Sequence, residues 1–214
     1  MAPAVNSSKA PRTRRAEQAE RTRRRILDAA TALFTDPGYA ATTIEAIATR
    51  ADVAVETVYS RFRNKPNLLV AILEPAIVGT DDDVALFDLP DIAEIRACID
   101  QRQQLDLLAH LSRTILQRTA QVHRILHAAA SVDENAAQLQ RTDAERRYLG
   151  QADYIDMLLA NGPLRAGVTR ANAVDTYATL ASPATYAFLV EDRGWTPEQF
   201  EEWLGDVLSR ALLP

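Results

Sequence analysis

The feature that most constrains the fold is an apolar stripe near the end of the chain. Its members follow the spacing i, i+3, i+4, i+7, i+8 and i+11, and they are Phe200, Trp203, Leu204, Val207, Leu208 and Ala211. This is the periodicity of one face of an α-helix. The stretch TPEQ at 196–199 comes just before the stripe and has a capping residue, a first-turn proline and a glutamine in capping-box order. The segment from residue 197 is therefore expected to be an amphipathic helix.

The rest of the chain also favours helices over strands. Only 7 of the 214 residues are glycine, and β-branched and aromatic residues do not gather in alternating runs. Helical periodicity predicts further helices over 92–109, 111–130, 134–160, 171–181 and 184–193. The expected fold class is all-α.

Composition excludes several kinds of protein. A single cysteine, Cys98, permits no disulfide within the chain and no thiolate metal cluster. No apolar run reaches the roughly 18 residues that a membrane span needs. The first residues contain no apolar core of a secretory signal. A cytoplasmic protein with no membrane contact is expected.

Charge is divided unevenly along the chain. Residues 1–65 hold 12 Lys/Arg and 7 Asp/Glu, a net charge of +5, whereas residues 66–214 hold 12 and 22, a net charge of −10. A basic head on an acidic body indicates a local contact with a polyanion.

The basic head has the pattern of a helix-turn-helix. Residues 1–19 are expected to be a flexible basic arm, and a first helix follows, which Pro37 and Gly38 are expected to end. The segment TTIEAIATR at 42–50 predicts a second helix capped by a threonine, and VETVYSRF at 55–62 predicts a third. Only the tight turn ADV at 51–53 separates them, which suits two crossing helices whose second member lies in the major groove of DNA. The outward positions of that helix are Val55, Glu56, Ser60 and Arg61.

This region resembles the TetR (tetracycline repressor) family of transcriptional regulators. The resemblance lies in the successive motifs ILDAA, LF, GY, TTIEAIA, TVYSRF and NK followed by LL, which cover about 50 residues. It implies an N-terminal three-helix helix-turn-helix DNA-binding domain, residues 20–66. A larger helical domain for ligand binding and dimerisation, residues 67–214, would follow it. The implied function is that of a sequence-specific repressor, released from a palindromic operator in double-stranded DNA by a small-molecule effector.

The resemblance also implies roles for individual residues. Thr43 and Lys65 would bind phosphates at helix N-termini, and Thr57 and Tyr59 would contact the DNA backbone or nearby bases. The family pattern usually has glycine at position 52 and serine at position 54, where this chain has Asp52 and Ala54. Asp52 is therefore a candidate to replace the missing cap of the recognition helix.

The effector is expected to be small and largely apolar, because polar residues are scattered among aliphatic ones in the helical body. The candidate pocket residues are Cys98, Gln101, Leu105, His110, Arg113, His127, Tyr154, Met157 and Tyr177. A homodimer is expected through the C-terminal helices, with the stripe from Phe200 to Ala211 facing Tyr177, Tyr186 and Phe188.

Other functions have weaker support in the sequence. His123 and His127 lie four residues apart on an expected helix, a spacing that suits a metal, but no supporting ligand occurs in the same run. Asp81–Asp83 favours a solvated linker over a magnesium site. No catalytic triad or phosphate-binding loop is present, so no enzyme activity and no cofactor are expected. A helical enzyme and an effector-independent DNA-binding protein remain the alternatives.

Overall fold

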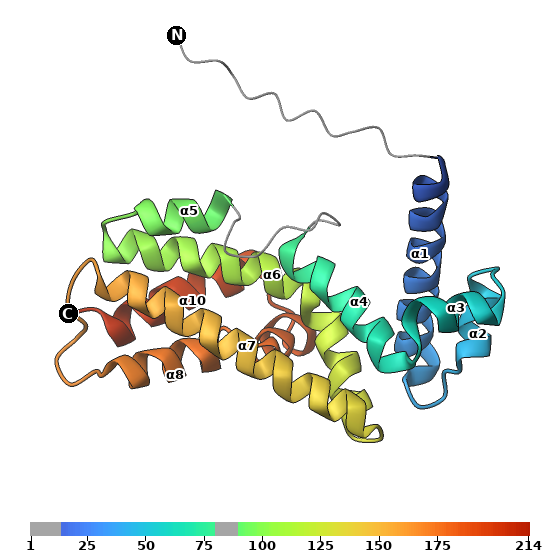
Figure 1. Cartoon of the computed structure of the whole chain (residues 1–214). Helices are drawn as coiled ribbons and strands as arrows, with labels where there is room; N and C mark the ends of the chain where they lie inside the picture. Colours follow the sequence, from blue (N-terminus) through green and yellow to red (C-terminus); the bar gives the residue numbers. More distant parts are fainter. Residues whose placement is uncertain (1–13, 80–89) are drawn as a thin grey trace, which may run out of the picture. The chain divides into compact units, whose positions relative to one another are not determined.

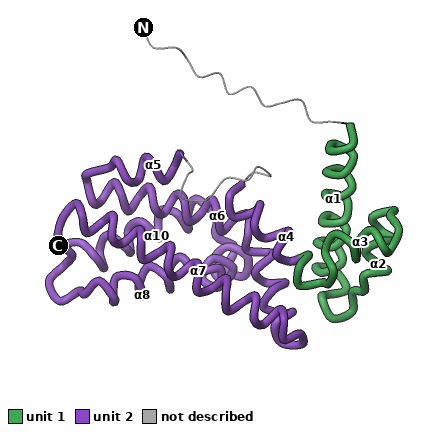
Figure 2. Tube along the Cα trace, viewed as in Figure 1, with its two compact units in different colours: residues 1–68 green, residues 69–214 purple. Residues whose placement is uncertain are grey.

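The computed structural model describes residues 14–79 and 90–214, and these residues form helices joined by short turns (Figure 1). They fall into two compact units, residues 1–68 and 69–214 (Figure 2). No helix among the described residues is long and apolar enough to cross a membrane.

The first unit is a small bundle built on α1 (Arg14–Leu33). A π-helical turn, η1 (Phe34–Gly38), continues α1, and two short helices follow, α2 (Ile44–Arg50) and α3 (Val55–Phe62). The apolar side chains of these helices meet in one core, whose most buried members are Ile26, Ala30, Phe34, Ile47, Ala48 and Val58. This burial fixes the angle at which α2 and α3 cross.

Side-chain caps set where the short helices begin. The Thr43 hydroxyl accepts the backbone N–H of Ala46 at the start of α2. The side-chain oxygen of Asn64, Oδ1, accepts the backbone N–H of Asn67 in the first turn of α4 (Lys65–Val78). The helix α4 begins in the first unit and continues into the second.

The second unit is arranged around one long helix, α6 (Gln101–Ala130). Four elements pack on it: α5 (Pro90–Ala97), α7 (Glu134–Leu159), α9 (Pro183–Tyr186) and α10 (Pro197–Leu212). The helix α8 (Arg170–Leu180) packs on α7 and α10, and a π-helical segment, η3 (Ala187–Asp192), follows α9. Leu105, Leu108, Ile155, Phe200 and Leu204 lie at the centre of the core.

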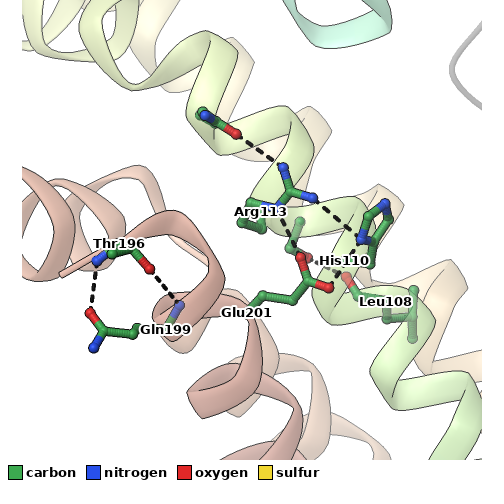
Figure 3. Close-up of polar contacts among 8 residues, drawn as sticks. Leu108, His110, Arg113, Thr196, Gln199 and Glu201 are labelled. Atoms are coloured by element: carbon green, nitrogen blue, oxygen red, sulfur yellow. Dashed lines mark hydrogen bonds and ion pairs between the residues drawn. The ribbon is translucent and has the colours of Figure 1, made fainter.

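The expected all-α fold is confirmed, and so is the capping box of the last helix. The Thr196 hydroxyl accepts the backbone N–H of Gln199, and the side-chain oxygen of Gln199 accepts the backbone N–H of Thr196 (Figure 3). Pro197 lies in the first turn. The stripe of that helix, however, packs inside its own unit, since Phe200, Leu204 and Leu208 are fully buried within one chain.

One break between helices was wrongly expected. The break in 92–130 lies at 98–100 and not at residue 110, because Asp100 caps α6 by accepting the backbone N–H of Gln103. The first helix ends at Gly38, as expected, although it first widens into η1 and holds Pro37 within that turn. The helix α4 runs to Val78 with Pro75 inside it.

At the N-terminus, α1 begins at Arg14, so the last six residues of the expected 1–19 arm are helical. Residues 1–13 and Asp81–Asp83 lie outside the described residues.

Two leucines of the second unit should differ sharply in their effect on stability. Leu108 is fully buried in the core, and Leu149 on α7 is 56% exposed. Leu108→Ala should lower the free energy of unfolding by about 2–5 kcal/mol, because it leaves a cavity. Leu149→Ala should change it by no more than about 0.5 kcal/mol. Urea unfolding followed by circular dichroism measures both, and equal losses would contradict this account of the core.

Candidate DNA-binding surface and ligand cavity

The helix α3 divides its side chains between the core and solvent. Val58 and Phe62 are buried, whereas Glu56, Tyr59, Ser60 and Arg61 are exposed and Val55 and Thr57 are partly exposed. Tyr59 is 47% exposed, which is unusual for a large aromatic side chain in a small unit. The structure therefore brings together, on the outward side of one helix, six of the eight residues expected to contact DNA.

The turn before α3 is held by a contact that the sequence did not predict. Asp52 has a left-handed backbone, with φ of 50°. Arg25 on α1 donates one hydrogen bond to the Asp52 carbonyl oxygen at 2.9 Å and another to its carboxylate at 2.8 Å. The expectation that Asp52 caps α3 is wrong, because its carboxylate faces Arg25 and Ala54, the N-cap residue, provides no side-chain cap. Arg25 instead ties the turn to α1.

Of the two expected phosphate-binding residues, Lys65 is already engaged within the first unit. Its Nζ donates to the backbone oxygens of Tyr39 at 2.7 Å and Thr42 at 3.0 Å, and lies 4.2 Å from the centre of the Tyr39 ring. Lys65 thus joins the first turn of α4 to the segment between η1 and α2. Thr43 is exposed at the start of α2, where its hydroxyl caps the helix.

The second unit contains a largely apolar cavity of about 320 Å³. This is at the small end of the roughly 300–1,000 Å³ typical of ligand pockets. It lies between α4, α6, α7 and α8. Its apolar wall is formed by Val70, Leu73, Ile77, Leu111, Ile115, Leu116, Leu139, Tyr154, Tyr177 and Ala181.

A pair of buried hydroxyl groups lies on this wall. The oxygens of Ser112 and Tyr177 are 2.7 Å apart, and Ser112 also donates to the backbone oxygen of Leu108 at 2.7 Å. Burial raises the pKa of Tyr177 to about 12, and the hydrogen bond with Ser112 acts in the opposite direction. The Tyr177 hydroxyl therefore keeps its proton at neutral pH.

A charged network forms a second polar part of the wall. Arg147 approaches Asp143 Oδ2 at 2.5 Å and His123 Nε2 at 2.8 Å, and these last two atoms are 3.2 Å apart. Burial acts to raise the pKa of Asp143, but contact with His123 and the charges of Arg147 and Arg146 outweigh it and lower that pKa. The same three residues also line a second, smaller cavity against α9.

The structure brings two of the nine expected pocket residues to the main cavity, Tyr154 and Tyr177. Leu105 and Met157 belong to the core and its edge, and His127 lines the second cavity, where it contacts Gln140. Cys98 donates to the Asp100 backbone oxygen just before α6. Gln101 donates to the backbone oxygens of Leu158 and Gly162, and so joins α6 to the end of α7.

The other two expected pocket residues form an ion-pair cluster with α10. His110 Nδ1 lies 3.0 Å from one carboxylate oxygen of Glu201, and Arg113 donates to the other at 2.8 Å (Figure 3). This cluster fixes α10 against α6, away from the cavity.

Sequence reasoning missed most of the cavity. The α4 residues Leu73 and Ile77 are apolar side chains that the sequence does not distinguish from ordinary core residues, and the α7 face around Asp143 and Arg147 has no clear periodic signal. For the two histidines, the described residues include no group of three or more potential metal ligands. His123 contacts Thr119, Asp143 and Arg147 instead.

Comparison with known proteins identifies sequence relatives of the N-terminal part of the chain. Residues 26–72 match the family model of bacterial regulatory proteins, tetR family. The HTH-type transcriptional repressor KstR of Rhodococcus jostii is 54% identical over 51 residues, 24% of each chain. The matched segments span about a quarter of the length of the curated relatives.

Solved structures share the fold over nearly the whole chain. One is NalD, the secondary repressor of the MexAB-OprM multidrug efflux pump in Pseudomonas aeruginosa, with a TM-score of 0.67, 23% identity and coverage of 92% of this chain and 98% of that chain. Another is a SmeT–triclosan complex, with a TM-score of 0.68, 21% identity and coverage of 90% and 92%.

The left-handed backbone of Asp52 gives a prediction about the turn. Asp52→Gly and Asp52→Ala both remove the carboxylate that faces Arg25, but only alanine is strained at a φ of 50°. The alanine variant should be less stable than the glycine variant by about 1 kcal/mol. Urea unfolding of the two variants side by side measures this difference, and equal stability would mean that the turn relaxes.

The lowered pKa of Asp143 gives a prediction about acid stability. A carboxylate with a lowered folded-state pKa stabilises the protein fully above its unfolded pKa of about 3.9, and loses this effect as pH falls through the folded value. Asp143→Asn should therefore cost about 1–3 kcal/mol at pH 7, and the gap from wild type should shrink as the pH falls below about 4.

Unfolding by urea at several pH values measures that gap. Asp153→Asn is the matched control, because it removes an exposed carboxylate from the same helix. A gap that stays constant with pH would show that Asp143 acts through packing and not through its charge.

Proposed function

We propose that this member of the tetR family of bacterial regulatory proteins is a cytoplasmic, sequence-specific DNA-binding repressor. In the proposal, its operator is palindromic and a small, largely apolar molecule releases it from DNA. The function is regulatory and not enzymatic. The observation that carries the proposal is the outward side of α3, where exposed hydroxyl, cationic and carboxylate side chains lie together on a helix that a buried core holds in place.

The roles within this surface follow from chemistry and position. Thr43, Thr57, Tyr59 and Arg61 would bind phosphates and set the register of the helix on DNA. Val55, Glu56 and Ser60 would face base edges in the major groove. A carboxylate such as that of Glu56 can accept a hydrogen bond from a cytosine amino group.

Lys65 would position α4 through its two backbone contacts, and its charge would also attract a nearby phosphate.

In this proposal, the helix α4 couples ligand binding in the cavity to DNA binding. The first residue of this helix, Lys65, bonds the backbone before α2, and its later residues Val70, Leu73 and Ile77 line the cavity. A ligand that displaces Leu73 or Ile77 would move a helix that also carries Lys65. Such a ligand can change DNA affinity only if it binds two arrangements of α4 with different affinity. The SmeT–triclosan complex supports the cavity as a ligand site, because that protein shares the fold and was solved with a small molecule.

A homodimer through the C-terminal helices completes the proposal, since a palindromic site suits a two-fold symmetric protein. The residues that could face a partner differ from those first expected. Tyr177 and Tyr186 are buried within the chain, whereas Phe188 is 55% exposed. Trp203 and Val207 are partly exposed on α10. These side chains are available for a contact between the two copies.

Selection of duplexes by the purified protein tests the proposed function. A random DNA library should yield an inverted repeat whose half-sites are about one helical turn apart. Addition of a compound that raises the melting temperature of the protein should also raise the operator Kd. Failure to enrich any sequence at moderate salt would refute the repressor proposal, and enrichment of a site without an inverted repeat would refute the dimer on DNA.

Substitutions in α3 test which residues read bases. Glu56→Gln should change the preferred base at one position of each half-site, by about 1–3 kcal/mol. Arg61→Ala should weaken operator and scrambled DNA alike, and lower the slope of log K against log salt by about 0.9 per lost phosphate contact. Binding titrations at several salt concentrations distinguish the two. The reverse pattern would mean that Arg61 reads a base and that Glu56 does not.

A further inference from the structure

The wall of the cavity between α4, α6, α7 and α8 carries several polar side chains, among them the buried hydroxyls of Ser112 and Tyr177. The hydrogen bonds of this pair show what it offers to a ligand. Ser112 and Tyr177 each carry one hydroxyl hydrogen. Ser112 donates its hydrogen to the backbone oxygen of Leu108, so the hydrogen between the two side chains comes from Tyr177. Both donors are then used inside the protein. Both oxygens keep lone pairs, and the Tyr177 oxygen keeps both of its own, so the pair can accept a hydrogen bond from a ligand but has none to donate.

The charged part of the wall is satisfied within the protein. Arg147 donates to the Asp143 carboxylate, and the same guanidinium nitrogen lies 2.8 Å from His123 Nε2. His123 Nδ1 lies 3.0 Å from the backbone oxygen of Thr119, and its Nε2 lies within hydrogen-bond distance of both Arg147 and Asp143, so both ring nitrogens have partners within the protein. Around the cavity, Glu74 and Arg146 are both exposed and carry opposite charges. No unbalanced charge therefore favours an ionised ligand, and burying one would be costly.

We infer that the cavity selects a neutral, largely apolar molecule with a hydroxyl group that donates a hydrogen bond to the Tyr177 oxygen. The inference rests on the proposed role of this cavity as the effector site and specifies the chemistry of the effector. Neutral phenols and alcohols on an apolar ring or chain fit this description. Their ethers lack the donor, and carboxylates of the same skeleton bring a charge that nothing in the wall neutralises.

Displacement of a fluorescent reporter tests the inference on the full chain without DNA. N-phenyl-1-naphthylamine is neutral and fluoresces in apolar surroundings, so it should bind the cavity. Three biphenyl probes then compete for the site: 4-phenylphenol, 4-methoxybiphenyl and biphenyl-4-carboxylate. The phenol should bind about tenfold more tightly than the ether, which is the effect of one buried hydrogen bond, and more tightly still than the carboxylate.

Variants of the hydroxyl pair assign the preference to particular atoms. Tyr177→Phe should abolish the advantage of the phenol over the ether while leaving the affinity for the ether nearly unchanged. Ser112→Ala should narrow that advantage, because the Tyr177 hydrogen is then free to bond the ether oxygen. Tyr186→Phe is the matched control, since Tyr186 is also buried but packs on Phe200 outside the cavity. It should leave all three affinities as in wild type.

Several outcomes would overturn the inference. Tightest binding by the carboxylate would mean that the charged network recognises an anion. An advantage of the phenol that survives Tyr177→Phe would place its donor elsewhere, and no displacement by any probe would show that the cavity rejects this class. Because no DNA is present, each outcome is independent of the operator selection that tests repression. A protein that binds its operator but none of these probes would lose only the assignment of the ligand.

Discussion

The second unit depends on the unbroken length of α6. Thirty residues at 1.5 Å each give a helix of about 45 Å, and α5, α7, α9 and α10 all pack on it. One part of its buried surface, around Leu105 and Leu108, packs in the hydrophobic core of the unit. The next turns, from Leu111 to His123, face the cavity. The cavity is therefore a stretch of the α6 surface that neighbouring helices surround without filling, so its position is fixed by the same packing that stabilises the unit.

Local sequence signals predicted the fold well and the cavity poorly. The caps at Thr43, Asn64 and Thr196 and the tight turn between α2 and α3 depend on residues close in sequence, so they could be read directly. Asp100 is a cap of the same local kind at the start of α6, although helical periodicity predicted the break at residue 110. The cavity depends on which turns of four helices come together. Periodicity shows that Leu111 and Leu73 point inward, but it does not show whether another side chain or an empty space lies opposite.

The first unit shows how long-range contacts replace local ones. The turn before α3 has aspartate where the family pattern usually has glycine, and the N-cap position lacks a hydroxyl. Arg25, which lies 27 residues earlier, supplies two hydrogen bonds to that turn, and Lys65 supplies two more to the segment before α2. Lys65 was expected to contact a DNA phosphate, and nothing in the sequence marked Arg25 as a partner of the turn. A basic residue of the first unit can therefore stabilise the fold, bind DNA or do both, and the sequence alone does not distinguish these roles.

The two π-helical segments among the described residues have a consequence for where the chain tolerates an extra residue. Each rotation of an α-helix takes 3.6 residues, so one inserted residue turns everything beyond it by about 100° and would expose the buried face. Both η1 and η3 lie at the end of a helix, and a turn or bend follows each directly, at Tyr39 and at Arg193. No helical face continues directly beyond them, so the wider π turn takes up an extra residue at the point where the chain leaves the helix. An alignment of this chain with its relatives should accordingly allow gaps at these two helix ends, and not only in the loops between helices.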